Sequence, residues 1–106
     1  MAFTGNEKHD INLEDATRLT RNYRNIAGDN SFLGAYFGRA AIQKILDQEQ
    51  CVGIRIYNAV NDEGKPNYVL VGVTEEEKDL YNGELAEMAI GCPPKCPGNS
   101  PLAGTV

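Results

Sequence analysis

The chain has 106 residues, of which 42% are hydrophobic and 24% charged, and its formal net charge at pH 7 is -5. This length suits one domain with a single core, and the composition excludes collagen-like, disordered and membrane-embedded proteins. Because an overall negative field repels phosphate backbones, nucleic acid is not an expected partner.

The first eleven residues are mainly polar and show no periodic pattern, so we predict a flexible arm over residues 1–11. The arm lacks the basic start and apolar stretch of a secretory signal, and no run of about 18 apolar residues follows it. We therefore expect a cytoplasmic protein with no membrane association. Three cysteines leave at least one without a partner inside the chain, and in a reducing cytoplasm we expect all three to be thiols.

Two helices are predicted in the N-terminal half. Asn12 is a good N-cap, Gly28 is a good helix stop, and the apolar residues between them recur with the helical period, which predicts a helix over residues 13–26. The same period over residues 39–48 predicts the second helix. The apolar arc of the first helix consists of Leu13, Ala16, Leu19, Tyr23 and Ile26.

The second half favours strands. Residues 52–57 and 67–73 are rich in β-forming side chains, and the turn residues 61–64 between them predict an antiparallel hairpin. We predict a third strand over residues 85–90, which continues the meander. Gly53 and Gly72 are expected to let other groups pack closely on one face of the sheet.

The order of these elements predicts an α+β fold. Two N-terminal helices are expected to pack on one face of a small three-stranded antiparallel meander. Prolines concentrate after residue 92, which predicts an extended Pro-rich C-terminal tail. The predicted organisation is an arm over 1–11, a single domain over 12–91 and a tail over 92–106.

Several segments, in this order, resemble a group of short, uncharacterised bacterial proteins. The segments are Cys51–Tyr57, Asp62–Pro66, Val69–Val73, and Ala86–Met88 followed by Cys92–Cys96. The resemblance covers roughly residues 12 to 100. Those proteins have no assigned activity, so the resemblance supports the boundaries and implies no function.

The segment from Cys92 to Pro97 is the first place where chemistry could occur. Two thiols on a stiff backbone could bind a soft metal such as zinc, form a local disulfide or react as a redox pair. Zinc would need two further ligands, and nothing in the sequence places Cys51 or His9 nearby. We prefer a structural role as a docked, extended segment, with zinc binding or thiol redox chemistry at Cys92 and Cys96 as alternatives.

Charged side chains form two other patterns. Arg18, Arg21 and Arg24 recur every third residue and could hold an anion or an acidic partner surface, although solvation and a pair between Glu14 and Arg18 explain them more simply. The acidic stretch 75–79 could attract a divalent cation through carboxylates, but we interpret it as a solvated loop.

The leading functional hypothesis is a small non-enzymatic binding or assembly module. A small sheet with open edges can recruit a strand from a protein partner or from a second copy. The first alternative is a thiol-redox or zinc protein acting through Cys92 and Cys96. The second is a small enzyme whose site combines Arg55 and Tyr57 with carboxylates of the acidic loop. A histidine-based mechanism is not expected, because the one histidine, His9, lies in the predicted arm.

Overall fold

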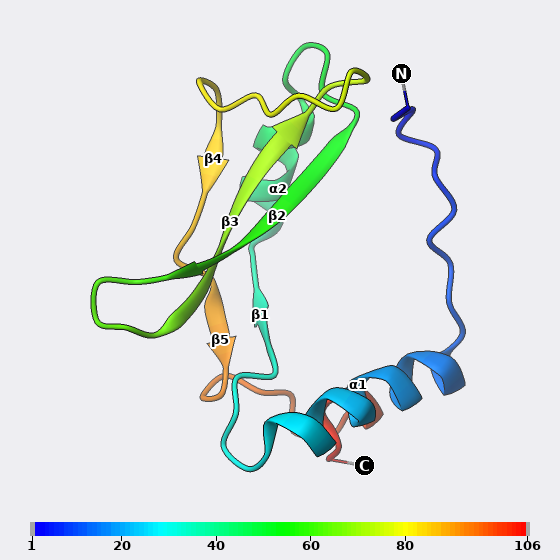
Figure 1. Ribbon diagram of the computed structural model, residues 1–106, viewed down its shortest axis with the longest axis vertical. Helices are drawn as coiled ribbons and strands as arrows, with labels where there is room; N and C mark the ends of the chain where they lie inside the picture. Colours follow the sequence, from blue (N-terminus) through cyan, green and yellow to red (C-terminus); the bar gives the residue numbers. More distant parts are fainter. Residues whose placement is uncertain (1, 106) are drawn as a thin grey trace. The chain divides into compact units, whose positions relative to one another are not determined.

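The computed structural model describes residues 2–105, and within them it shows an α+β structure with two α-helices and antiparallel sheets of two and three strands. The chain divides into two compact units (Figure 1). The first unit contains residues 2–8 and 37–89, and the second contains residues 9–36 and 90–105. The boundaries predicted at residues 11 and 91, and the flexibility of the arm, stay predictions.

The first unit is built on the three-stranded sheet, in the order β2 (Gly53–Val60), β3 (Pro66–Val73) and β4 (Leu85–Ala86). β2 and β3 form the predicted antiparallel hairpin along their whole length. The side chain of Asn61 organises the turn, because its Oδ1 accepts hydrogen bonds from the backbone N–H groups of Glu63 and Lys65, both at 2.9 Å. Gly64 completes it with a φ of 81°, a conformation that glycine adopts without strain.

Helix α2 (Arg39–Leu46) contacts all three strands of this sheet and supplies the centre of the core. Ile45 is only 1% exposed, and the other buried apolar side chains of the described residues are Leu70, Val71 and Val73 on β3. A Cβ on Gly72 would lie 2.9 Å from Sγ of Cys51 and 3.3 Å from Ile45, so the close packing expected there is confirmed. The same expectation is wrong for Gly53, where a Cβ would meet nothing within 4 Å.

Helix α1 (Leu13–Ala27) belongs to the second unit, begins at the predicted residue and ends one residue beyond the predicted Ile26. Oδ1 of Asn12 accepts a hydrogen bond from the N–H of Asp15 at 2.7 Å, and Gly28 stops the helix with a φ of 85°. No residue of α1 is buried. The packing of α1 on the meander stays a prediction. Neither α1 nor any other helix within residues 2–105 has the length and apolar character that crossing a membrane requires.

The predicted third strand is interrupted. Its first part, β4, pairs with β3, but the chain then forms β5 (Ile90–Cys92), which pairs with β1 (Gly34–Tyr36) in the two-stranded sheet. Met88 separates the two strands with a φ of 60°, which lies outside the extended range of a strand. The prediction of one continuous strand over 85–90 is therefore wrong, and β1 lies where no definite element was predicted.

The C-terminal segment also differs from the extended tail that its prolines suggested. Pro101–Ala103 forms a short 3-10 helix, η1, whose N-cap Ser100 accepts a hydrogen bond from the N–H of Leu102 at 3.2 Å. Proline suits the first position of a helical turn, because its N–H is not needed there and its φ is already helical. Nη1 of Arg24 on α1 donates to the carbonyl of Leu102 at 2.7 Å and connects η1 to α1.

Candidate functional site

The main polar cluster of the first unit joins Arg55, Tyr57 and Asp79. Arg55 and Tyr57 alternate on β2 and so lie on the same face of the sheet. Asp79 is the last residue of the acidic loop 75–79 and forms a bridge to Val73 at the end of β3. Nη1 of Arg55 donates to Oδ1 of Asp79 at 2.5 Å, and the hydroxyl of Tyr57 donates to Oδ2 at 2.5 Å. The structure thus brings together the two predicted residues and one carboxylate of the acidic loop.

The two donors of this cluster have shifted pKa values. The hydrogen bond to Asp79 raises the pKa of Tyr57, because the carboxylate favours the protonated phenol, and partial desolvation acts in the same direction. The hydrogen bond to Asp79 also raises the pKa of Arg55, against the effect of desolvation. The carboxylate thus stabilises the proton-bearing form of both donors, and the three side chains satisfy one another.

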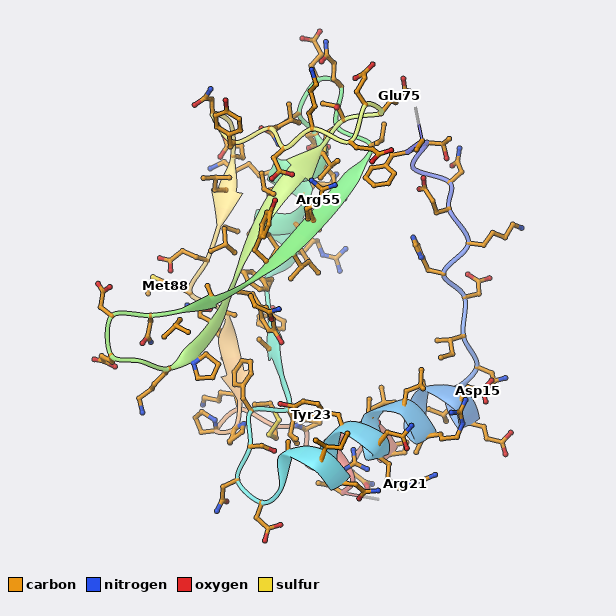
Figure 2. All side chains as sticks on the ribbon, viewed as in Figure 1. Asp15, Arg21, Tyr23, Arg55, Glu75 and Met88 are labelled. Carbon is orange, nitrogen blue, oxygen red and sulfur yellow. A yellow bond between two sulfur atoms is a disulfide. The ribbon has the colours of Figure 1, made fainter. Side chains whose placement is uncertain are left out.

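Phe3 of the N-terminal segment lies against the same cluster. The guanidinium carbon of Arg55 lies 5.8 Å from the centre of the Phe3 ring, within the range of a cation–π contact. The backbone N–H of Phe3 donates to the carbonyl of Glu75 at 3.3 Å, and Nη1 of Arg55 lies 3.4 Å from the carbonyl of Glu77. Figure 2 labels Arg55 and Glu75 in this part of the first unit. Arg55 therefore connects β2 to the acidic loop and to the N-terminal segment.

A hollow of about 400 Å³ lies between the residues that precede β2 and those that follow β3. It is lined by Gln50, Cys51, Val52, Thr74, Glu75 and Glu76. The Cys51 thiol is half-buried and donates to the carbonyl of Gly53 at 3.2 Å. Within residues 2–105, no three side chains of His, Cys, Asp or Glu come together as a metal-binding group.

The outer edge of the eight-residue strand β2 is paired with no other strand of the described residues. β2 is the first strand of the order β2-β3-β4, so only one of its edges is paired within the described chain (Figure 1). Its side chains Ile56 and Val60 are 61% and 69% exposed, and Tyr57 is also exposed. β2 contains no Lys and no Pro, and its one charged side chain, Arg55, is bound by Asp79.

The predicted arginine row is divided by its interactions. Arg18 pairs with Asp15 at 3.5 Å, in place of the Glu14 partner that the spacing suggested. Arg24 donates to the carbonyl of Leu102, and its guanidinium lies against Gly104. Arg21 is exposed and leaves α1 on the side opposite to Tyr23 (Figure 2). The three arginines therefore do not form a row of equivalent, unoccupied cations.

Cys92 and Cys96 form a disulfide, with their Cα atoms 4.6 Å apart. The expectation that all three cysteines are thiols is therefore wrong for this pair, and Cys51 is the remaining thiol. Pairing of β5 with β1 holds Cys92 in place, and the intervening chain is short enough to bring Cys96 back to it. In this oxidised form the two sulfurs cannot coordinate zinc, because zinc binds cysteine as the thiolate.

Two residues of the Arg55 cluster, Phe3 and Asp79, have no signal in the sequence that assigns them to it. Phe3 lies in the predicted arm, and no periodic signal connects it with Arg55, which is fifty-two positions away in the sequence. Asp79 is one of several acidic residues that the sequence does not tell apart, and its bridge to Val73 and its hydrogen bonds with Arg55 and Tyr57 distinguish it from Glu75 and Glu76. Comparisons with models of protein families, with curated proteins and with solved structures give no significant match to this chain.

Proposed function

We propose that this protein is a small assembly module that associates through the outer edge of β2, with a second copy of the chain as its partner. The observation that supports the proposal is the eight-residue edge of Gly53–Val60, which pairs with no strand of residues 2–105 on its outer side. Unpaired N–H and C=O groups along such an edge form hydrogen bonds with an added strand.

The composition of β2 supports this proposal. Natural proteins protect open edges with charged side chains, proline, bulges or very short strands. β4, at the opposite edge of the same sheet, is only two residues long. β2 is long, has no lysine or proline, and exposes Ile56 and Val60. A strand of this kind is expected to be covered in the functional state.

Charge and symmetry favour a second copy as the partner. Antiparallel pairing of two copies of β2 about a two-fold axis at Ile56 would set Arg55 of one copy opposite Tyr57 of the other, on the same face of the joined sheet. Arg55 would therefore not face its own equivalent, and Asp79 already balances its charge. Only four apolar side chains are buried within residues 2–105, so burial of Ile56 and Val60 would add substantially to the apolar area removed from water.

The oligomeric state tests the proposal directly. Sedimentation equilibrium of the wild-type chain across the micromolar range is expected to show a monomer–dimer equilibrium. The double substitution Ile56→Lys with Val60→Lys places like charges along the edge and is expected to weaken dimerisation by at least about tenfold. Circular dichroism should show that the fold is kept, because both side chains are exposed in the single chain.

Two matched variants serve as controls. Leu85→Lys changes an exposed apolar residue on the short edge strand β4, and Ile26→Lys does so on α1. Neither is expected to change the dimerisation constant. A strictly monomeric wild type, or equal loss of dimer in all variants, would contradict the proposal.

The enzyme alternative receives one supporting observation, the meeting of Arg55, Tyr57 and Asp79. Their hydrogen-bonding groups are directed at one another, which suits a connection between loop and strand. We therefore assign the cluster a positioning role, in which it fixes β2 against the acidic loop and keeps the only charge of the edge neutralised.

A further inference from the structure

The disulfide between Cys92 and Cys96 closes a loop of five residues at the end of β5. Such a short loop restrains the unfolded chain less than a long one, so the bond is a weak structural clamp. The feature is independent of the β2 edge, since it belongs to the second unit. Stabilisation of the fold therefore accounts for only a small part of what this disulfide could contribute.

Backbone hydrogen bonds hold the loop without help from the sulfur atoms. Cys92 pairs with Gly34 in the two-stranded sheet, and its carbonyl accepts a hydrogen bond from the N–H of Leu33 at 2.7 Å. The N–H of Lys95 donates to the carbonyl of Gly91 at 3.0 Å. A Cβ on Gly91 would lie 2.8 Å from the Phe32 ring, so this part of the loop is closely packed. The two cysteines are thus expected to stay neighbours when the disulfide is reduced.

The two cysteines of the disulfide differ in solvent exposure. Cys96 is exposed, whereas Cys92 is half-buried within β5. A thiolate from solution can therefore reach Cys96 more easily than Cys92. When it attacks Cys96, the sulfur of Cys92 is the leaving group. Lys95, which is exposed and adjacent to Cys96, supplies the only charge of the loop. A nearby ammonium group favours the thiolate form of cysteine, which is the reactive form.

We propose that Cys92 and Cys96 form a thiol–disulfide exchange site whose substrate is a dithiol. A thiolate of the substrate attacks Sγ of Cys96 and forms a mixed disulfide, while the electron pair of the broken S–S bond passes to Cys92, which leaves as a thiolate and takes up a proton. The second substrate thiol, as its thiolate, attacks the substrate sulfur of the mixed disulfide and releases Cys96. The substrate becomes an internal disulfide, and the two electrons and two protons that it loses are those that the protein gains.

The first experiment uses the full chain with Cys51→Ser, so that only the proposed pair can react. The protein is equilibrated with mixtures of reduced and oxidised dithiothreitol, alkylated and weighed by intact mass spectrometry. We expect reversible gain of two alkyl groups while the circular dichroism spectrum stays native. A disulfide that is reduced only after denaturation, or whose reduction unfolds the protein, would make the bond structural and overturn the proposal.

The second experiment separates the roles of the two cysteines with oxidised glutathione as probe. In the same background, reduced Cys92→Ser is expected to accumulate a mixed disulfide at Cys96, whereas the chain with both cysteines should resolve it. Cys96→Ser should form its mixed disulfide at Cys92 more slowly, by roughly tenfold, because that thiol is half-buried. Equal rates in the two single variants, or no accumulation in either, would contradict the assigned roles.

The third measurement tests Lys95. At neutral pH, Lys95→Gln should slow alkylation of the reduced pair by roughly threefold, because the thiolate fraction falls. Lys65→Gln, in the exposed turn between β2 and β3, is the matched control and should leave the rate unchanged. Identical rates in the two lysine variants would exclude Lys95 from the site.

Discussion

Asp79 binds the guanidinium group of Arg55 across 24 positions of the sequence, with Nη1 of Arg55 2.5 Å from Oδ1 of Asp79. Arg55 lies on β2, and Asp79 bridges to Val73 at the end of β3. The other oxygen of the same carboxylate, Oδ2, accepts a hydrogen bond from the hydroxyl of Tyr57. One side chain therefore fixes the acidic loop against two positions of the edge strand.

The first prediction concerns pH. Tyr57 holds its proton more tightly in the folded chain than in the unfolded one, because Asp79 raises its pKa. The stability that this provides is present below the unfolded pKa of about 10 and is lost as the pH rises through the folded value. Asp79→Asn should lower the pKa of Tyr57 and reduce this alkaline loss of stability.

Tyrosinate absorbance measures the effect. Subtracting the titration curve of the Tyr57→Phe variant from that of its parent chain leaves the titration of Tyr57 alone. The measurement is made twice, once in the wild-type chain and once in the Asp79→Asn chain. Difference curves that superimpose with Asp79 and with Asn at position 79 would show that Asp79 does not raise the pKa of Tyr57.

The second prediction concerns the glycines of the hairpin. Gly72→Ala should destabilise the fold by about 1–3 kcal/mol, because the new methyl group would crowd Cys51, Gln48 and Ile45. Gly53→Ala is the matched control, since a Cβ there meets nothing within 4 Å. Urea unfolding of the two variants checks the difference, and a larger effect at Gly53 would contradict the described packing.

The third prediction concerns the core. Ile45→Ala should lower the free energy of unfolding by about 2–5 kcal/mol, because Ile45 is almost completely buried between α2 and the sheet. Leu46→Ala removes a neighbouring side chain that is 39% exposed and should cost less. Thermal and urea unfolding measure both changes. An equal decrease in the free energy of unfolding in the two variants would contradict the central position of Ile45 in the core.

The fourth prediction concerns the start of α1. Asn12→Ala should destabilise the helix by about 1 kcal/mol, because the N–H of Asp15 loses its side-chain acceptor. Asn25→Ala makes the same substitution on the exposed surface of α1 and should change stability by less than about 0.5 kcal/mol. Amide hydrogen exchange in the first turn is the measurement, and unchanged protection in Asn12→Ala would be inconsistent with the cap.

The sequence by itself determined the features that depend on neighbouring residues. Asn12 and Gly28 mark the ends of α1 because capping involves groups only a few positions apart. The β2–β3 hairpin followed from alternating side chains and a four-residue turn, and α2 from its helical period. Such signals are short-range, so they can be read without knowledge of the rest of the chain.

Only the tertiary structure decided which distant residues meet. The strand predicted over 85–90 is divided because Met88 adopts a positive φ and β5 finds its partner in β1, more than fifty residues earlier in the chain. The choice of Asp79 among the acidic residues and the contact of Phe3 with Arg55 likewise depend on how the backbone brings these groups together. Pairing between distant segments is selected by the packing of the whole fold, and no local period or propensity encodes it.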